Sequence, residues 1–492
     1  MRLLTAALVI ALSVSCATAQ TFNDFINSLY PLTPEQKAAK IDSFMNAADR
    51  FPYIDQDSLC HYIYRGTATS VQVAGDVTDW AVGFSLQHVA DTDFWFANKY
   101  YEMDARLDYK YVIDGSNWIL DPLNPHLCYG GYGPNSELRM PGYEYPDEVD
   151  YISEHPGTVE TFYLASDTLT YGNPRQYKVY LPNGYDPEGA ARYPLILAHD
   201  GTDYLTLAKM ARVLDYLIDN QRIEPVIGLF VPPASSDVRT FEYGTTHRDE
   251  YIDFIANELI PHIDSTFCTD PRRERRATVG DSYGGNISLQ LAATHPELFG
   301  HAAGQSPFVS KELQELLDVD LTTENPIDSL DVWVDIGTYD IGLLEMQVAD
   351  TLIPILQNRG YNYSLTTMHE GHSWGNWRKN LQPILKRFFP GVNVSTPEIQ
   401  QGMMPRDFQL LPNHPNPFNG TTMLSFQMNR KSWARLSVLD LLGRQVAVLG
   451  EEQFSPGHHT ISFNASSLAS GSYIAMLETA GQREARRITL IK

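Results

Sequence analysis

The chain has little cysteine for its length. It contains four cysteines in 492 residues, and Cys60, Cys128 and Cys268 are the three that follow the N-terminal apolar segment. Three cysteines cannot all pair, so a scaffold built on disulfides is excluded. Cys60 and Cys128 bracket one strand-rich region and could form a bridge, whereas we expect Cys268 to be a buried thiol. The spacing of cysteine and histidine indicates no zinc site, and we expect no metal and no cofactor.

Basic charge is also scarce. Lys and Arg total 36 against 60 Asp and Glu, which gives a formal net charge of −24 at pH 7. Nucleic acids and anionic membranes are bound through basic patches, so this balance argues against both as partners. Beyond the N-terminus the chain lacks an apolar run long enough to cross a bilayer, so we expect no transmembrane anchor.

The N-terminus has the pattern of a secretory signal peptide. A charged start precedes the apolar run Leu3–Val14, and Ala17-Thr18-Ala19 fits an A-x-A cleavage site. This pattern predicts a signal peptide over 1–19 and a mature chain that starts at Gln20. Cys16 raises a lipoprotein alternative, although the residues before it form a poor lipobox. The sequence therefore predicts export.

The rest of the chain is too long for one hydrophobic core and divides by pattern. Thr33 before Pro34 predicts the start of a helix that runs to Ala48. Further on, apolar strand patterns alternate with helical patterns, which favours a doubly wound α/β domain with a mostly parallel sheet. We assign 20–57 to an N-terminal helical segment, 58–145 to a β-sandwich, 158–390 to the α/β domain, 391–404 to a linker and 405–492 to a second β-sandwich.

The stretch Gly280-Asp281-Ser282-Tyr283-Gly284 fits G-x-S-x-G. In that motif the serine stands on a strained turn between a strand and a helix, and the flanking glycines make room for the turn. Here a short β-compatible segment precedes the motif, and a helical pattern follows it as far as His295-Pro296. The context predicts that Ser282 is a nucleophile on such an elbow, rather than a solvated serine in a glycine-rich turn.

A serine hydroxyl needs a histidine base that a carboxylate orients, and α/β hydrolases place them in the order Ser, acid, His. His372 lies in a glycine-containing loop late in the domain, and Asp340 leaves the strand before it. We therefore predict a triad of Ser282, His372 and Asp340. The other candidates fit less well: His295 and His301 come too early, His369 lies in or at the end of a strand, Asp335 lies inside a strand, and Glu345 is the second choice for the acid.

The oxyanion that forms when a serine attacks a carbonyl needs backbone N–H donors. One donor is expected from Tyr283, the residue after the nucleophile. The other is expected from the loop after the first parallel strand, where Gly201 lets the backbone bend. The predicted oxyanion hole is Tyr283 with Gly201 or Thr202.

Several stretches resemble the esterase family that holds enterochelin esterases, esterase D and the feruloyl esterases of carbohydrate esterase family 1. They are His199-Asp200-Gly201, Arg239-Thr240-Phe241-Glu242, the elbow, Gly337 to Asp340, and Gly371-His372-Ser373-Trp374 with Trp377-Arg378. The resemblance implies an α/β-hydrolase fold and ester hydrolysis, and it does not specify the substrate. We expect substrate contacts from Asp200, Tyr204, Arg239, Trp374 and Trp377, with bracing of the histidine loop as the alternative for the two tryptophans.

A second resemblance covers the strand-rich region 58–145. Val73–Trp80, Tyr109–Gly115 and Asp121–Pro125 are similar to the small β-sandwiches that include carbohydrate-binding module family 48. In glycogen-binding members two tryptophans, a lysine and an asparagine contact sugar. By position these resemble Trp80, Trp118, Lys110 and Asn135. The alternative is that both tryptophans pack in the sandwich or against the next domain.

A third resemblance lies at the C-terminus. The run from Leu411 to Asn419 and the basic, apolar end Arg487–Lys492 are similar to type A sorting domains of the type IX secretion system of Bacteroidetes-like bacteria. This implies that the type IX machinery is a partner and that the protein is secreted or held at the cell surface. The alternative is a plain accessory β-domain.

Together these features predict a secreted serine carboxylic-ester hydrolase that has an α/β-hydrolase domain flanked by two β-sandwiches. We expect a carbohydrate esterase that removes feruloyl or acetyl groups from plant polysaccharide. One alternative is an enterochelin-type siderophore esterase, for which the acidic chain lacks an evident basic cleft. The alternative of another class is a non-catalytic glycan-binding protein on an inactive hydrolase scaffold.

Overall fold

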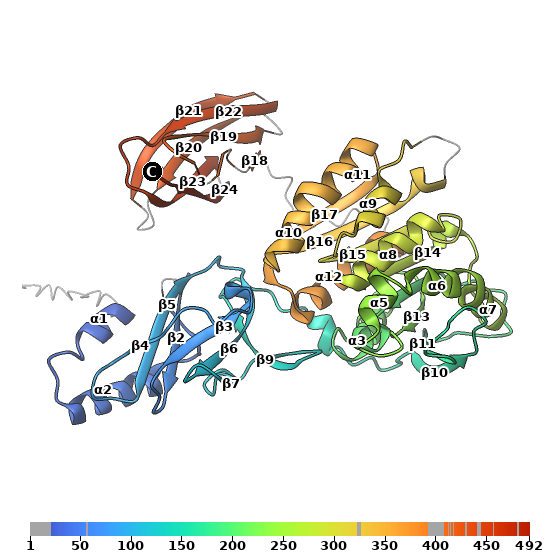
Figure 1. The fold of residues 1–492 in the computed structure, drawn as a ribbon, viewed down its shortest axis with the longest axis horizontal. Coiled ribbons are helices and arrows are strands. Elements are labelled where there is room, and N and C mark those ends of the chain that lie inside the picture. The colour runs from blue at the N-terminus through green and yellow to red at the C-terminus, as the bar shows by residue number, and fades with distance from the viewer. Residues whose placement is uncertain are drawn as a thin grey trace, which may run out of the picture. The chain divides into compact units, whose positions relative to one another are not determined.

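The computed structural model places the chain in two compact units, Met1–Asn393 and Val394–Lys492. Figure 1 shows the ribbon of each unit. The structure describes residues 21–55, 58–321 and 326–391, and then 408–411, 413, 415–416, 418–428, 431–439, 444–455, 457–479 and 482–492. The predicted signal peptide 1–19, and the predicted linker beyond residue 391, lie outside the described residues.

Two helices open the described chain, α1 (Phe22–Asn27) and α2 (Pro34–Ala47). The Thr33 side chain accepts from the backbone N–H of Gln36, and the Gln36 side chain accepts from the backbone N–H of Thr33. This reciprocal cap, with Pro34 at the first helical position, starts α2 where the sequence predicts. Phe22 and Ile41 are buried against the first β-sheet, so the two helices cover its outer face.

The N-terminal region forms the predicted β-sandwich. One sheet has the order β1-β2-β5-β4, and the other is built around β6 with β3, β7, β9 and β8. Side chains alternate across β6, so Tyr109 and Tyr111 lie in the buried core between the sheets. The strands are β1 (Tyr53–Asp55), β2 (Leu59–Arg65), β3 (Val71–Gly75), β4 (Gln87–His88), β5 (Phe94–Tyr100), β6 (Arg106–Ile113), β7 (Asn117–Ile119), β8 (Leu127–Gly130) and β9 (Gly133–Arg139).

The cysteines correct one possibility that the sequence left open. Cys60 lies in the core of the sandwich, whereas Cys128 faces out of it and packs in a core of the following region. Both are free, buried thiols, as is Cys268. The bridge between Cys60 and Cys128 is therefore not formed, because their side chains point into different cores.

The central sheet of the α/β region has the order β10-β11-β13-β12-β14-β15-β16-β17. β10 and β11 form an antiparallel hairpin at the edge, and the pairs from β13 to β17 are parallel. The mostly parallel sheet that the sequence predicts is confirmed. The strands are β10 (Thr158–Leu164), β11 (Arg175–Leu181), β12 (Leu195–His199), β13 (Ile227–Val231), β14 (Arg276–Asp281), β15 (His301–Gln305), β16 (Asp331–Tyr339) and β17 (Asn362–Gly371).

Helices cover both faces of this sheet (Figure 1). Successive residues of β12 show the two layers, since Leu197 packs with α8 in one core and Ala198 packs with α4 and α12 in the other. The fold is therefore doubly wound. No helix in the described ranges is long and apolar enough to cross a membrane. The helices are α3 (Gly201–Thr206), α4 (Met210–Asp219), α5 (Arg239–Gly244), α6 (Arg248–Asp253), α7 (Ile260–Thr266), α8 (Tyr283–Thr294), α9 (Lys311–Leu317), α10 (Gly342–Gln347), α11 (Ile353–Arg359) and α12 (Trp374–Phe388).

The central sheet continues into the N-terminal sandwich. β17 pairs in parallel with β6, through Glu370 and Arg106. One sheet therefore links the regions that the sequence divides into 58–145 and 158–390, and both regions lie in the same compact unit.

The second unit is the predicted C-terminal β-sandwich. Phe426 of one sheet and Leu436 of the other lie in a common buried core. One sheet contains β18 (Phe408–Leu410), β19 (Thr421–Met428) and β22 (Gly457–Asn464), and the other contains β21 (Gln445–Phe454), β20 (Ser432–Leu439), β23 (Gly471–Thr479) and β24 (Gln482–Leu490).

Candidate active site

Ser282 stands on a strained turn between β14 and α8. Its backbone has φ 55° and ψ −118°, a combination that an L-residue rarely adopts. A Cβ added at Gly280 would lie 2.1 Å from the carbonyl oxygen of Gly284, so the turn closes too tightly for a side chain there. The structure thus has the predicted elbow, with Ser282 half-buried at its tip.

His372 and Asp340 meet beside the elbow. His372 lies between β17 and α12, Asp340 follows β16, and His372 Nδ1 is 2.8 Å from Asp340 Oδ1. The Asp340 side chain is fully buried, and that of His372 is 16% exposed. A carboxylate against Nδ1 favours the tautomer with its proton on Nδ1, which leaves Nε2 free to accept a proton. The arrangement suits a general base.

Ser306 supports Asp340 from the loop after β15, and the sequence analysis did not single it out. Its hydroxyl donates to Asp340 Oδ2 at 2.6 Å, and the Trp377 indole donates to the same hydroxyl at 3.1 Å. The backbone N–H of Ile341 donates to Asp340 Oδ1 at 2.7 Å. Both carboxylate oxygens are therefore held in place. One sequence feature could have indicated Ser306. It is a polar residue that directly follows β15, the parallel strand between β14 and β16.

The same loop connects Asp340 to Ser282. The Ser282 N–H donates to the carbonyl oxygen of Gln305 at 2.8 Å, and Ser306, the next residue, holds Asp340. β14, β15, β16 and β17 are parallel neighbours, so the residues that follow them meet at one edge of the sheet. Ser282, Asp340 and His372 follow three of these four strands.

The predicted oxyanion donors start two helices at this edge. Tyr283 begins α8, Gly201 begins α3, and Thr202 is the second residue of α3. N–H groups in a first turn have no acceptor within the helix, and the positive end of the helix dipole favours a developing negative charge. β12, which leads into α3, pairs directly with β14, which leads into Ser282. Tyr283 with Gly201 or Thr202 stays the predicted oxyanion hole.

Asp200 and Arg239 form an ion pair next to the elbow. Arg239 Nε and Nη2 each lie 2.6 Å from one oxygen of Asp200, and Nη2 also donates to the carbonyl oxygen of Asp281 at 3.1 Å. Burial and the charge of Asp200 raise the pKa of the Asp281 carboxyl well above its usual range, while Arg239 opposes the shift. Asp200 and Arg239 therefore hold the backbone just before Ser282, and their predicted contact with substrate stays a prediction.

The aromatic residues predicted to contact substrate are instead buried. Tyr204 is 0% exposed and donates to Gln305 Oε1 at 2.8 Å, and Trp374 and Trp377 are 6% and 5% exposed. Trp377 places its ring edge-on to His372, with centroids 4.9 Å apart, and Trp374 packs edge-on against both Trp377 and Tyr204. This burial leaves little surface for a substrate and favours bracing of the histidine loop as the role of the two tryptophans. Contact of the three residues with substrate stays a prediction.

The alternative acids and bases have other partners. Asp335 is fully buried inside β16 and accepts from the Trp333 indole at 2.9 Å. His369 pairs with Asp104 of the sandwich at 2.7 Å, and His295 pairs with Glu297 at 2.9 Å. The structure therefore favours His372 and Asp340 over these candidates.

The predicted sugar contacts lie partly on one face of the sandwich. The strand register places Lys110, Trp118 and Asn135 on the same side of the sheet, opposite its buried core. Trp118 is 42% exposed, so it does not pack in a core. Trp80 is half-buried and its indole donates to Asp76 Oδ1 at 3.0 Å. Sugar binding by these residues stays a prediction.

Comparison with protein families agrees with this geometry. Residues 168–388, which include all three triad candidates, match the family model described as Putative esterase. We refer to this segment as the esterase domain. The match supports carboxylic-ester hydrolysis as its reaction. Residues 414–492 match the model described as a secretion system C-terminal sorting domain, which covers most of the second unit.

Two curated relatives match part of this chain. The uncharacterized protein YjcH of Bacillus subtilis (strain 168) is 29% identical over 219 residues, which is 42% of this chain and 89% of the relative. An endo-1,4-beta-xylanase/feruloyl esterase of Xylanibacter ruminicola is 26% identical over 206 residues, which is 39% of this chain but only 27% of that enzyme.

Solved structures show that the fold extends beyond the esterase domain. Enterochelin esterase from Shigella flexneri matches with a TM-score of 0.56 and 20% identity, over 70% of this chain and 97% of that one. Ferric enterobactin esterase from Salmonella typhimurium matches with a TM-score of 0.57 and 17% identity, over 68% and 94%. Each match covers more of this chain than 168–388, so the shared fold extends beyond that segment. At these identities the likeness concerns the fold alone.

Proposed function

We propose that the protein is a secreted serine esterase that uses Ser282 as nucleophile, His372 as base and Asp340 as the group that orients the base. The observation that carries the proposal is the strained Ser282 on its elbow, at the same edge of the sheet as the hydrogen-bonded pair of His372 and Asp340. A strained backbone at a residue other than glycine costs folding free energy, and such strain is found mainly at active sites and ligand-binding sites. The esterase-family match supports the same reaction.

The geometry suggests how ester hydrolysis proceeds. Ser282 Oγ attacks the ester carbonyl carbon while His372 Nε2 takes the hydroxyl proton, and Asp340 stabilises the imidazolium that forms. The oxyanion accepts from the N–H groups of Tyr283 and of Gly201 or Thr202. His372 then gives its proton to the leaving alkoxide, which departs as the alcohol. A water molecule repeats the sequence on the acyl-enzyme and releases the acid and Ser282.

We infer that the substrate is an ester on a polysaccharide, with a feruloyl or acetyl group. Support comes from the relative named as an endo-1,4-beta-xylanase/feruloyl esterase and from the exposed Trp118 on the sandwich. The net charge of −24 favours a neutral substrate over an anionic siderophore. The alternative, an enterochelin-type siderophore esterase, is tested by including enterobactin among the substrates.

We also propose that the type IX secretion machinery exports the protein to the cell surface or the medium. The C-terminal sorting domain supports export, and the signal-peptide pattern of 1–19 fits a first passage into the periplasm.

The test is product analysis with purified protein on methyl ferulate, acetylated xylan and enterobactin, side by side. The proposal predicts release of ferulate or acetate from the first two substrates and little release of dihydroxybenzoylserine from the third. Hydrolysis of enterobactin alone would favour the siderophore alternative. No release of acid from any substrate, nor from p-nitrophenyl acetate, by folded protein would favour the non-catalytic glycan-binding alternative.

A further inference from the structure

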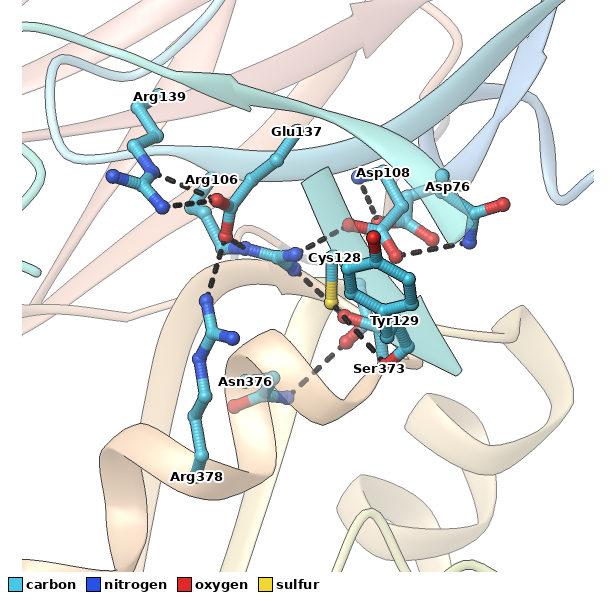
Figure 2. Close-up of polar contacts among 12 residues, drawn as sticks. Asp76, Arg106, Asp108, Cys128, Tyr129, Glu137, Arg139, Ser373, Asn376 and Arg378 are labelled. Carbon is cyan, nitrogen blue, oxygen red and sulfur yellow. Dashed lines mark hydrogen bonds and ion pairs between the residues drawn. The ribbon is translucent and has the colours of Figure 1, made fainter. Parts of the chain in front are cut away.

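The loop that carries His372 is held by the N-terminal sandwich as well as by the esterase domain (Figure 2). Arg106, the first residue of β6, is 0% exposed, and its Nη1 donates to Oγ of Ser373 at 2.7 Å. Its Nε donates to Glu137 at 2.6 Å and its Nη2 donates to Asp108. One guanidinium therefore ties two carboxylates of the sandwich to the residue that follows His372.

The glycines on either side of His372 show how closely the sandwich packs on this loop. A Cβ added at Gly371 would lie 2.0 Å from Cγ of Asp76, and one added at Gly375 would lie 1.9 Å from Cζ of Arg106. Neither position has room for a side chain while Asp76 and Arg106 keep their places. Gly371 and Gly375 thus let two buried polar side chains of the sandwich reach the backbone on both sides of the histidine.

Glu137 extends the connection to α12. Its carboxylate accepts from Arg106, from Arg139 of the sandwich and from Arg378 of α12, the last at 3.0 Å. Burial alone would raise the pKa of Glu137, but the three guanidiniums outweigh it and lower the pKa to about 2. The carboxylate is therefore ionised at neutral pH. In a buried network of this kind, loss of one member leaves charge without a partner.

Two contacts from one turn of the sandwich reach the same region. The Tyr339 hydroxyl, next to Asp340, donates to Glu102 at 2.7 Å, and His369 pairs with Asp104 at 2.7 Å. The main-chain pairing of β6 with β17 is made by Glu370, which lies between His369 and the histidine loop. The sandwich therefore touches the chain beside the acid and beside the base.

We propose that Arg106 is a positioning residue for His372, and that the N-terminal sandwich is part of the catalytic unit rather than an appended module. Arg106 acts through the Ser373 hydroxyl and through the backbone at Gly375, which together fix where the histidine loop turns into α12. This inference rests on the proposed function, because it takes His372 as the base.

The test uses the full chain and p-nitrophenyl acetate. Ser373→Ala removes the acceptor on the loop, and Arg106→Lys keeps the charge but loses the forked donors. We expect each variant to lower kcat about tenfold to hundredfold, because a base displaced on the ångström scale loses about that much rate. KM should stay within about twofold, since the change does not alter substrate binding.

Arg139→Met is the matched control. Arg139 bonds to the same Glu137 from the solvent side and is 26% exposed, and the hydrogen bonds described for its side chain go to Glu137 rather than to the histidine loop. This variant should lower the melting temperature and keep the wild-type kcat. The downfield proton resonance of the His372 Nδ1–H should persist in Arg139→Met. It should weaken in Ser373→Ala and Arg106→Lys, as water reaches a loosened pair.

The outcomes separate this inference from the proposed function. Wild-type kcat in folded Ser373→Ala and Arg106→Lys would overturn the role of Arg106 while the esterase assignment stands. If Arg106→Lys fails to fold, Ser373→Ala alone decides. A wild-type protein that hydrolyses no ester would remove the proposed function, and this inference with it.

Discussion

Replacing Ser306 by alanine tests how Asp340, the proposed acid of the triad, is held. Ser306 is 0% exposed and its hydroxyl links Asp340 Oδ2 to the Trp377 indole. A hydrogen bond to a charged group contributes about 1.5–3 kcal/mol, and a buried indole N–H left without an acceptor costs about 1–3 kcal/mol. We expect Ser306→Ala to lose about 3–5 kcal/mol of unfolding free energy and several degrees of Tm.

Activity should fall by a separate route. Asp340 Oδ1 still faces His372, but without the hydroxyl the carboxylate can rotate and the imidazole loses its orientation. We expect kcat on p-nitrophenyl acetate to fall about tenfold with KM nearly unchanged.

Ser306→Gly is the control for backbone effects. Ser306 has φ 45°, which glycine adopts without strain. The glycine variant should be more stable than the alanine variant by about 1 kcal/mol, yet no more active. The reasoning would be refuted by a Ser306→Ala protein that melts and turns over like wild type.

Two further predictions concern buried charge. Arg175→Met should lower the free energy of unfolding, measured by chemical denaturation, by about 3–5 kcal/mol, because it leaves Glu242 without its buried partner. Adding Glu242→Leu should recover most of that loss. An Arg175→Met protein as stable as wild type would contradict this. Burial raises the pKa of Asp335 to about 7. Below that pH the folded state keeps a proton that the unfolded chain loses near pH 4, so unfolding free energy should fall by about 4 kcal/mol as pH rises from 4 to 7. Asp335→Asn should make the unfolding free energy depend less on pH between pH 4 and pH 7. The same pH dependence in the variant and in the wild type would contradict this prediction.

The elements predictable from sequence are those that short-range rules define. The elbow at Ser282 follows from glycines that the turn itself requires, and His372 and Asp340 follow from chain order in a parallel sheet. The start of α2 follows from the reciprocal cap between Thr33 and Gln36. In each case the deciding residues lie within a few positions of one another or in a fixed order.

Other parts of the site depend on contacts that are remote in sequence. Nothing near Arg106 indicates that β6 pairs with β17 or that its guanidinium reaches Ser373. The positive φ of Ser306 is not signalled by its residue type. For Trp374 and Trp377, a tryptophan beside a catalytic histidine fits a substrate wall and a buried brace equally well by sequence, and only the packing around each ring distinguishes the two.

The most direct test of the central claim is to find which residue becomes acylated or phosphonylated. The full chain is treated with a fluorophosphonate ester, digested and mapped by mass spectrometry, beside Ser282→Ala treated in the same way. The account predicts a single adduct on Ser282, no adduct in the variant, and loss of ester hydrolysis by several orders of magnitude with folding intact. An adduct on another residue, or a Ser282→Ala protein that keeps activity within about tenfold of wild type, would contradict it.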